Sequence, residues 1–318
     1  MDWLKPLYPE IYQVLLAAIP DYWPELKSVF GTLFEEPLMS VAMLPLVTCQ
    51  AVGGQAKEAV HVSAALIAAE RCVRIFDDLE DKDRPGQLWQ QVGEARAWNY
   101  ASAIHILSFE ILSKAPYHPR VFHDINQLYI DAFFYMAAGQ DRDIAGITRT
   151  IEDYWSTIEL KTAMAYAAAC ASGAIVGTET PTLIEACYLY GHHVGLAIQI
   201  FNDMESIWQP DGRTDLKQGK VTLPLLYGLQ SDHPDRDELA MLVETNQFAT
   251  QVDRVREILD RIDTKSFLIW AALKEREQAL EAISACPNAE GKEALESFIT
   301  GMFGDIGSLL QEEQHKSA

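Results

Sequence analysis

Apolar residues recur along this chain at intervals of three and four, which places them on one face of an α-helix. Signals for strands are almost absent, because the sequence has no Asn-Gly hairpin and little strict alternation of apolar and polar residues. Proline and glycine separate the periodic segments. The predicted helices span roughly residues 8–19, 22–34, 38–52, 56–81, 90–114, 119–139, 150–174, 181–208, 220–229, 235–247, 250–260, 265–284 and 290–311. This pattern predicts an all-α helical bundle.

The most apolar of these helices, over residues 56–81, 150–174 and 181–208, are expected in the middle of the bundle. The chain has 318 residues, of which 49% are hydrophobic, and no linker rich in proline, glycine or serine divides it. We therefore expect one domain over residues 1–318.

The charge of the chain excludes some classes of partner. A formal net charge of −21 argues against nucleic acid, because phosphate backbones are bound by lysine and arginine, and against adhesion to anionic lipid. Charged residues interrupt the apolar runs well before the roughly 18 residues of a membrane span, so none is expected. The start of the chain lacks the basic and apolar regions of a signal peptide. A cytoplasmic protein is therefore expected.

The five cysteines are scattered, odd in number and mostly placed within apolar helical runs. This usage is typical of buried thiols in a reducing compartment rather than of a disulfide framework or a zinc site. No Ser-His-Asp or Cys-His arrangement can be recognised in the sequence. The adjacent His192 and His193 are expected to be packing or surface residues.

Acidic residues close the apolar helix predicted over residues 56–81. On a helix, Asp77, Asp78 and Asp81 fall at about 0°, 100° and 40° around the axis, so that their carboxylates share one arc. Acids at a helix C-terminus cost stability unless a cation binds them. Closely spaced carboxylate oxygens suit Mg²⁺, which typically bridges to a phosphate-bearing ligand. We call these three aspartates the first acidic arc.

A solvated helix end is the commoner explanation of such a cluster, but a similar arc occurs far down the chain. Asn202, Asp203 and Ser206 have the same spacing and end the apolar helix predicted over residues 181–208. We call them the second arc. Two oxygen-rich arcs facing each other across a cavity would hold several metal ions for a diphosphate, and the two spacings together are far more specific than either alone.

Three basic residues could add contacts to a phosphate. Arg84, in the loop after the first acidic arc, could reach back with its planar guanidinium, although a surface arginine would look the same. Lys161, followed by Thr162, interrupts a strongly apolar helix and needs an anionic partner, either a ligand or a carboxylate such as Asp143. Lys220, near a predicted helix N-terminus, could add a further contact.

Together these residues resemble the motifs of the trans-type isoprenoid diphosphate synthases and of their relatives, the class I terpene synthases. The resemblance covers about residues 38 to 230. Its six motifs occur in order and are Asp77-Asp78-Leu79-Glu80-Asp81, Asn99, Gly139-Gln140 with Asp143, Lys161-Thr162, Gln199 with Asn202-Asp203, and Gly219-Lys220 with Thr222-Leu223-Pro224. The resemblance implies an isoprenoid-synthase bundle with a central apolar cavity, a prenyl diphosphate substrate, Mg²⁺ as cofactor and a homodimer.

The departures from the family pattern concern one of its two diphosphate sites. Elongating synthases carry a Gly-Gly-Lys-Arg-x-Arg-Pro segment whose cations bind isopentenyl diphosphate, whereas the corresponding residues 36–41 contain no cation. Elongating synthases also have Arg-Arg-Gly after the first motif, whereas this chain has Arg84-Pro85-Gly86. A second diphosphate would therefore have almost nothing to neutralise it.

The second arc resembles the terpene-synthase metal motif Asn-Asp-x-x-Ser-x-x-x-Glu, although Pro210 stands at its last position. The resemblance thus implies a class I terpene synthase that ionises a farnesyl- or geranylgeranyl-class diphosphate with Mg²⁺ and cyclises or quenches the allyl cation. Three alternatives stay open, namely a polyprenyl diphosphate synthase with unrecognised cations, a prenyltransferase with another acceptor, and a non-catalytic partner subunit of a prenyl synthase.

Under this interpretation three groups of residues act together. The catalytic residues, which stabilise the departing diphosphate, are Asp77, Asp78, Asp81, Arg84, Lys161 and Lys220. The metal ligands are Asp77, Asp81, Asn202, Asp203 and Ser206. The residues that contact the substrate are Phe76, Tyr100, Thr162, Gln199, Cys72 and Val73. Further aromatic candidates for the cavity wall are Trp155, Tyr166 and Phe201.

Overall fold

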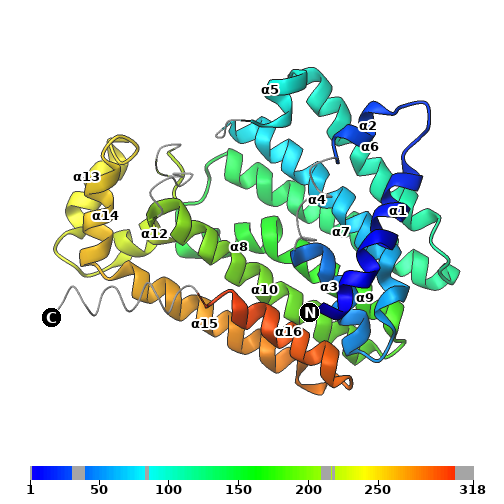
Figure 1. Cartoon of the computed structure of the whole chain (residues 1–318). Coiled ribbons are helices and arrows are strands. Elements are labelled where there is room, and N and C mark those ends of the chain that lie inside the picture. The colour runs from blue at the N-terminus through cyan, green and yellow to red at the C-terminus, as the bar shows by residue number, and fades with distance from the viewer. Residues whose placement is uncertain (1, 31–39, 83–85, 209–215, 217–218, 305–318) are drawn as a thin grey trace. The chain divides into compact units, whose positions relative to one another are not determined.

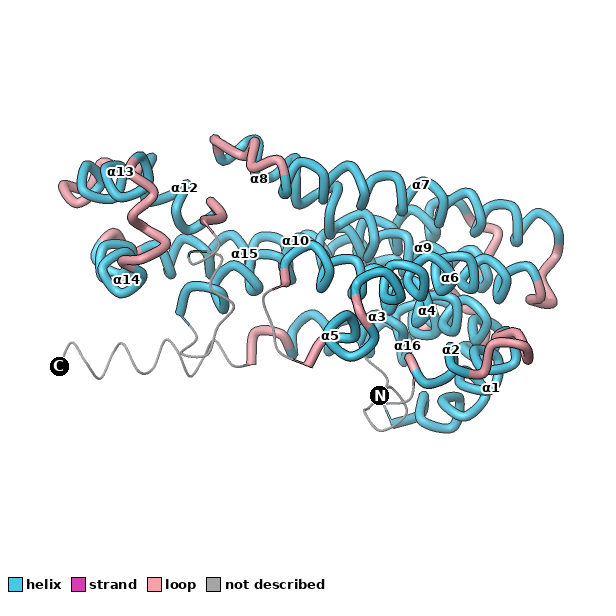
Figure 2. The backbone as a smooth tube through the Cα atoms, turned by 90° about the horizontal axis from the view of Figure 1, so that it is seen from above, coloured by secondary structure: helices cyan, strands magenta, loops and turns pink. Residues whose placement is uncertain are grey.

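The computed structural model describes residues 2–30, 40–82, 86–208, 216 and 219–304 of the chain. Within these residues every regular element is a helix, and no strand is drawn in Figure 2. The all-α class predicted from the sequence is therefore confirmed.

Most helices follow the predicted segments to within a few residues. Their bounds are α1 (Tyr8–Ala18), α2 (Glu25–Ser28), α3 (Ser40–Ala51), α4 (Val60–Asp81), α5 (Leu88–Val92), α6 (Glu94–Ser113), α7 (Pro119–Ile144), α8 (Ile151–Ile158), α9 (Met164–Gly177), α10 (Pro181–Trp208), α12 (Leu223–Gln230), α13 (Arg236–Glu244), α14 (Val252–Arg261), α15 (Thr264–Ala282) and α16 (Ala289–Gly301). Short 3₁₀ helices occur at Asp2–Leu7, Ala56–Ala59 and Ile283–Ala285.

Two features of these helices do not follow from the apolar spacing. The segment predicted as one helix over residues 90–114 is divided into α5 and α6 at Gly93, whose φ of 84° lies in the left-handed region. The segment predicted over residues 150–174 contains a π-helical turn, Glu159–Ala163, between α8 and α9. Because a π-helical turn holds more residues than an α-helical one, the faces of α8 and α9 do not share one register.

Contacts between residues divide the chain into two compact units, which are described separately. The first unit contains Met1–Tyr129, Ala168–Tyr190 and Leu280–Ala318, and the second contains Ile130–Ala167 and Gly191–Ala279. The first acidic arc therefore belongs to the first unit, and the second arc belongs to the second unit together with Lys161 and Lys220. The single domain expected from the sequence stays a prediction.

The first unit is built on close packing between helices. Helix α4 packs along α6, and α3 packs against α16 (Figure 1). A Cβ added at Gly173 of α9 would lie 2.6 Å from the Cα of Pro45, so the backbones of α9 and α3 are in contact. The Tyr190 hydroxyl donates to the Leu295 carbonyl oxygen at 2.7 Å and joins the start of α10 to α16.

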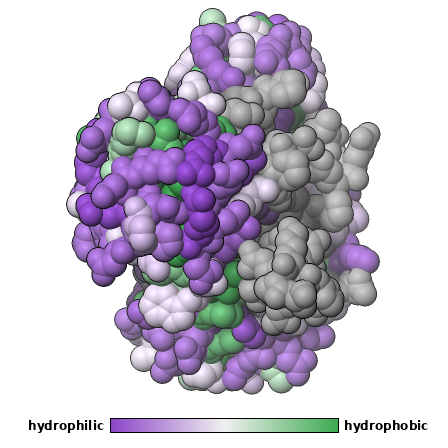
Figure 3. Space-filling view, turned by 90° about the vertical axis from the view of Figure 1, so that its left-hand side faces the viewer, coloured by the Kyte–Doolittle hydropathy of each residue, from purple (hydrophilic) through white to green (hydrophobic). Residues whose placement is uncertain are grey.

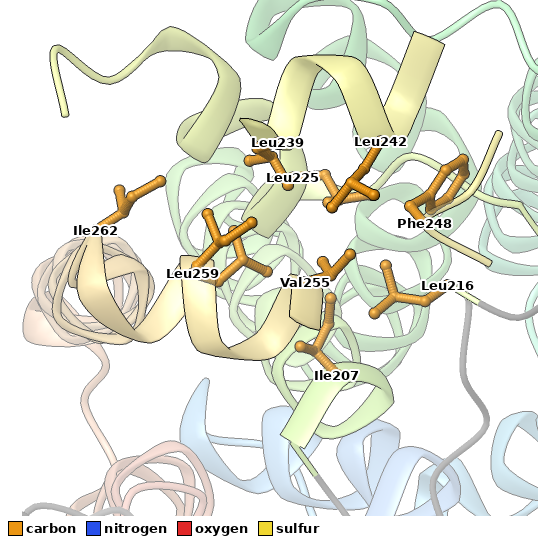
Figure 4. Close-up of a cluster of buried hydrophobic side chains, with 10 residues drawn as sticks. Ile207, Leu216, Leu225, Leu239, Leu242, Phe248, Val255, Leu259 and Ile262 are labelled. Carbon is orange, nitrogen blue, oxygen red and sulfur yellow. The ribbon is translucent and has the colours of Figure 1, made fainter. Parts of the chain in front are cut away.

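The second unit contains a separate apolar cluster, shown in Figure 4. Its buried residues come from the end of α10, from α12, α13 and α14, and from the segments beside them, and they are Ile207, Leu216, Leu225, Leu239, Leu242, Phe248, Val255, Ile258, Leu259 and Ile262. The opposite face of α14 is polar, and most of the described surface seen from the side of α13 and α14 is hydrophilic (Figure 3). The cluster therefore holds these short helices to the end of α10 by burial of apolar surface.

All five cysteines are free and buried, as the sequence predicts. Burial raises the pKa of the Cys72 thiol to about 12, so this group stays protonated at neutral pH. Among the residues described, one helical stretch, Ile151–Gly177, is long and apolar enough to cross a membrane by length and composition alone. Half of its most apolar window is buried inside the protein, and a buried core helix passes the same test.

The apolar cluster of the second unit makes a first prediction. Leu259→Ala removes a side chain with no exposed surface, so it should lower the free energy of unfolding by about 2–5 kcal/mol. Met241→Ala is the matched control, because the Met241 side chain in the neighbouring helix α13 is mostly exposed, and it should change stability by less than about 0.5 kcal/mol. Urea denaturation followed by circular dichroism measures both, and equal losses would contradict the assignment of this cluster as a core.

Candidate functional site

Helix α4 carries the first acidic arc at its end. The helix is regular from Val60 to Asp81, so Asp77 and Asp81 lie one turn apart on the same face, as predicted. All three aspartates are partly exposed, whereas Ile75 and Leu79 are buried on the other face. The arc therefore offers its carboxylates to solvent while the helix stays anchored in the first unit.

Local contacts order the end of α4. The Gln87 amide nitrogen donates to Asp78 Oδ1 at 3.1 Å. Lys82 ends the helix in the left-handed conformation, with a φ of 49°, and its Nζ lies 2.7 Å from Glu94 Oε1. Asp77 and Asp81 also take part in interactions with other groups. Arg84, the predicted cation of this loop, lies outside the described residues.

The residues expected to contact the prenyl chain in the first unit differ in accessibility. Phe76 and Val73 are partly exposed, and the Phe76 ring lies 5.2 Å from the Trp98 ring. Cys72 has no exposed surface, and Tyr100 has 4% of its surface exposed. The Tyr100 ring stacks on Trp23, with 5.6 Å between centroids, and so takes part in packing.

The second arc does not have the uniform exposure that its spacing suggests. Asn202 is exposed, whereas Asp203 keeps only 1% and Ser206 only 6% of its surface. Asp203 Oδ1 accepts a hydrogen bond from Gln199 Nε2 at 2.9 Å, and Asp203 Oδ2 accepts one from the Leu223 backbone nitrogen at 3.2 Å. Of the three residues, Asn202 is the one whose side chain is open to a ligand.

Lys161 and Lys220 converge on one carboxylate in the second unit. Lys161 Nζ lies 2.6 Å from Asp143 Oδ2, and Lys220 Nζ lies 3.8 Å from the same oxygen. The three side chains are each about a quarter exposed. The partner that the sequence suggests for Lys161 is thus observed, and a second lysine joins it.

The π-helical turn Glu159–Ala163 places Lys161 and Thr162 at the site. Gly139 of α7 allows this approach, because a Cβ added there would lie 2.7 Å from the Cα of Lys161. Thr162 Oγ1 donates to Gln199 Oε1 at 2.9 Å. The amide of Gln199 is therefore hydrogen-bonded on both sides, to Thr162 and to Asp203.

Trp155 lines a different part of the second unit. It borders a cavity of about 630 Å³ together with residues of α12 and α15, including Tyr227, Phe267 and Trp270. Neither lysine of the site nor any residue of the second arc lines this cavity. Tyr166 and Phe201 are partly buried. The central cavity expected between the two arcs stays a prediction.

The donor chemistry of the first acidic arc fits Mg²⁺. Asp77 and Asp81 supply carboxylate oxygens one helical turn apart, and Mg²⁺ is usually bound by one or two carboxylates together with water and substrate phosphates. Across the described part of the chain, no group of three or more His, Cys, Asp or Glu side chains could hold a metal ion by itself. Mg²⁺ bound here would take its remaining oxygen ligands from water and from a substrate phosphate.

Sequence reasoning missed two contributors to this site. The backbone N–H of Leu223 binds Asp203, but a main-chain donor has no signature in a sequence. The role of Gly139 could have been found from its position four residues before Asp143, which puts both on one face of α7.

The family profile described as polyprenyl synthetase matches residues 40–262. The chain is 29% identical over 270 residues to the short chain isoprenyl diphosphate synthase of Methanothermobacter thermautotrophicus, covering 79% of this chain and 81% of that protein. It is 30% identical over 262 residues to the geranylgeranyl diphosphate synthase of Mycobacterium tuberculosis, covering 78% and 74% of the two chains. The matched region includes both arcs and both lysines, so the chain belongs to the polyprenyl synthetase family.

Solved structures show the same fold. The geranylgeranyl pyrophosphate synthetase of Pyrococcus horikoshii superposes with a TM-score of 0.81 over 94% of this chain and 95% of that one, at 21% sequence identity. The predicted membership of the isoprenoid synthase superfamily is thus confirmed.

The close approach at Gly139 makes a second prediction. Gly139→Ala forces a methyl group against the backbone of Lys161 and should lower the free energy of unfolding by about 1–3 kcal/mol. Gly301→Ala is the control, because an added Cβ meets nothing within 4 Å there. Urea denaturation measures both variants. Equal stability of the two would show that α7 does not hold the π-helical turn.

Proposed function

We propose that the protein is a trans-prenyltransferase that ionises an allylic prenyl diphosphate with the help of Mg²⁺. The observation that carries this proposal is the convergence of Lys161 and Lys220 on the single carboxylate of Asp143. Two ammonium groups thus bring positive charge to one carboxylate in a chain whose formal charge is −21. Such a local charge at partly exposed side chains suits a polyanion, and a diphosphate has enough oxygens to contact both lysines.

The reaction needs a group that stabilises departing diphosphate. When the bond between the prenyl carbon and its diphosphate oxygen breaks, the electron pair stays on the oxygen and an allyl cation remains. In this proposal Lys161 and Lys220, which meet at Asp143, stabilise the charge that develops on the leaving group. In the first unit, Asp77 and Asp81 would hold Mg²⁺, an ion whose positive charge favours the departure of a diphosphate.

Family membership supports isopentenyl diphosphate as the acceptor of the prenyl group, because the relatives named above are prenyl diphosphate synthases. Chain elongation of this kind would transfer the allyl cation to the double bond of the acceptor, which then loses a proton. We propose this reaction as the first candidate.

A class I terpene synthase is the second candidate, because a specific sequence observation favours it. Residues 36–41 contain no cation, and Pro85 replaces an arginine, so the cations that bind isopentenyl diphosphate in elongating synthases are missing. Residues 36–39 and Pro85 lie outside the described residues. In this second candidate the allyl cation is cyclised or quenched within the protein. A prenyltransferase that uses an acceptor other than isopentenyl diphosphate would also need no isopentenyl site, and it is a variant of the first candidate.

The retention of both lysines, of Asp143 and of the first acidic arc supports an active enzyme rather than a non-catalytic partner subunit. A subunit that only modified another synthase would not need a preserved allylic site. The cytoplasmic location expected from the sequence patterns and the homodimer implied by the resemblance are part of the same proposal.

Product analysis decides between the two candidates. Incubation with Mg²⁺ and farnesyl or geranylgeranyl diphosphate should give a longer prenyl diphosphate only when isopentenyl diphosphate is added, and mass spectrometry of the extracted products measures this. A hydrocarbon or alcohol formed without isopentenyl diphosphate would overturn the first candidate in favour of the second. Unchanged substrate under every condition, including prolonged incubation with fresh protein, would reject both.

The first acidic arc makes a further prediction. Asp77→Ala and Asp81→Ala each remove a carboxylate from the arc and should lower the turnover of prenyl diphosphate by about a hundredfold or more. Glu80→Gln is the control, because Glu80 is exposed outside the arc, and its turnover should stay within about threefold of the parent. Persistence of activity in both alanine variants would remove the metal assignment.

A further inference from the structure

Polar contacts, together with the covalent chain at residues 161–162 and 220–223, form a closed ring through the segments that carry Lys161 and Lys220. We call it the polar ring, and its members are Asp143, Lys161, Thr162, Gln199, Asp203, Leu223 and Lys220. Asp143 closes the ring on one side by binding both lysines. On the other side, Thr162 donates to Gln199, Gln199 donates to Asp203, and Asp203 accepts from the backbone of Leu223. All members lie in the second unit.

Asp203 acts in this ring as the cap of α12. Thr222 stands at the N-cap position but makes no capping hydrogen bond with its side chain. The N–H of Leu223, the first residue of α12, is instead bound by Asp203 Oδ2 from α10. A carboxylate at a helix N-terminus satisfies an otherwise unpaired donor and interacts favourably with the helix dipole. Asp203 therefore fixes the start of α12, three residues after Lys220.

Gln199 connects this cap to the π-helical turn. It lies four residues after Gly195, where an added Cβ would be 2.6 Å from the Cα of Ala163. Helix α10 therefore contacts the π-helical turn at Gly195, and Gln199 reaches Thr162 one helical turn later.

We propose that Asp203 is a positioning residue for the two lysines rather than a ligand of the metal. Its carboxylate holds the start of α12 near Lys220 and, through Gln199 and Thr162, the turn that carries Lys161. The distance between the two ammonium groups is thereby set before a diphosphate binds, so less of the binding energy is lost in ordering them. This role rests on the proposed function of the site as a diphosphate site, and it revises the metal assignment expected for Asp203 from its spacing.

The ring can be broken and rebuilt without altering its shape. Gln199→Glu removes the donor that binds Asp203 and brings two carboxylates together, so it breaks the ring. In the double variant Gln199→Glu with Asp203→Asn, the new amide at position 203 donates to the glutamate and still accepts from Leu223. The double variant also has the same net charge as the parent. Restoration by the second substitution is expected for a hydrogen-bonded ring and not for a metal ligand.

Two measurements on the full-length protein test the proposal. The first is the affinity for inorganic pyrophosphate by calorimetry in the presence of EDTA, which excludes any contribution of a metal. Gln199→Glu should weaken this affinity about tenfold, and the double variant should return it to within about threefold of the parent. The second is hydrogen exchange at the Leu223 amide, which should speed up about tenfold in Gln199→Glu and recover in the double variant.

Asp203→Asn alone separates positioning from metal binding. After a rotation of the Gln199 side-chain amide by about 180°, the new amide at position 203 donates to the Gln199 oxygen, so the ring is kept. The Mg²⁺ concentration for half-maximal activity should therefore stay within about threefold of the parent. A rise of about tenfold or more, with unchanged exchange at Leu223, would overturn the proposal and return Asp203 to the metal. A double variant no better than Gln199→Glu in pyrophosphate affinity would overturn it as well.

Glu185→Gln is the charge control for Asp203→Asn, because each removes one carboxylate and Glu185 is exposed near the start of the same helix. It should leave the Mg²⁺ concentration for half-maximal activity and the exchange at Leu223 unchanged. The two measurements also separate this inference from the proposed function. Exchange at Leu223 needs no ligand, so it tests the ring even if the parent protein binds no pyrophosphate, an outcome that would reject the diphosphate site itself.

Discussion

Two helices approach the π-helical turn Glu159–Ala163 closely enough for their backbones to touch, and the chemistry of the second unit depends on this approach. Glycine stands at each point of contact, Gly139 in α7 and Gly195 in α10. One helical turn after each glycine comes the polar side chain that binds the turn, namely Asp143 for Lys161 and Gln199 for Thr162. A larger residue at either contact would move the helix away from the turn and lengthen these hydrogen bonds.

The same arrangement explains how a strongly acidic protein can present a basic site. Lys161 and Lys220 lie within 4 Å of one carboxylate oxygen, a distance well inside the roughly 8 Å over which salt screens charges at physiological ionic strength. Their charges therefore act locally, whatever the sign of the whole chain. Asp143 reduces the repulsion between the two ammonium groups. Asp203, almost fully buried, contributes through hydrogen bonds to the segments that carry the lysines.

In the first unit, the acidic end of α4 is held by neighbouring side chains rather than by burial. Gln87 binds Asp78, and Lys82 ends the helix while pairing with Glu94. The aspartates remain partly exposed at a helix terminus that disfavours negative charge. Such an arrangement is typical of a site that acts on a ligand, since stability alone would favour a basic residue at this position.

The sequence by itself determined the helical class, most helix positions and the types of residue at the site. Apolar spacing and breakers set the helices, because these signals are local. The arcs and Lys161 could be recognised because acids at a helix end and a lysine in an apolar helix conflict with ordinary packing. Combining these residues into one predicted site depended on a resemblance to a known family.

Only the tertiary structure decided which of these side chains are open and which are engaged. Equal spacing in the second arc predicted equal roles for Asn202 and Asp203, yet Asn202 is exposed, whereas Asp203 is buried and accepts a hydrogen bond from the Leu223 backbone nitrogen. The π-helical turn and the contact of Gly195 could also not be predicted, because they arise where backbones distant in sequence meet. Helical periodicity predicts which face of a helix is buried but not which segments cover that face. The hydrogen bonds of a side chain depend on the particular segments packed beside it.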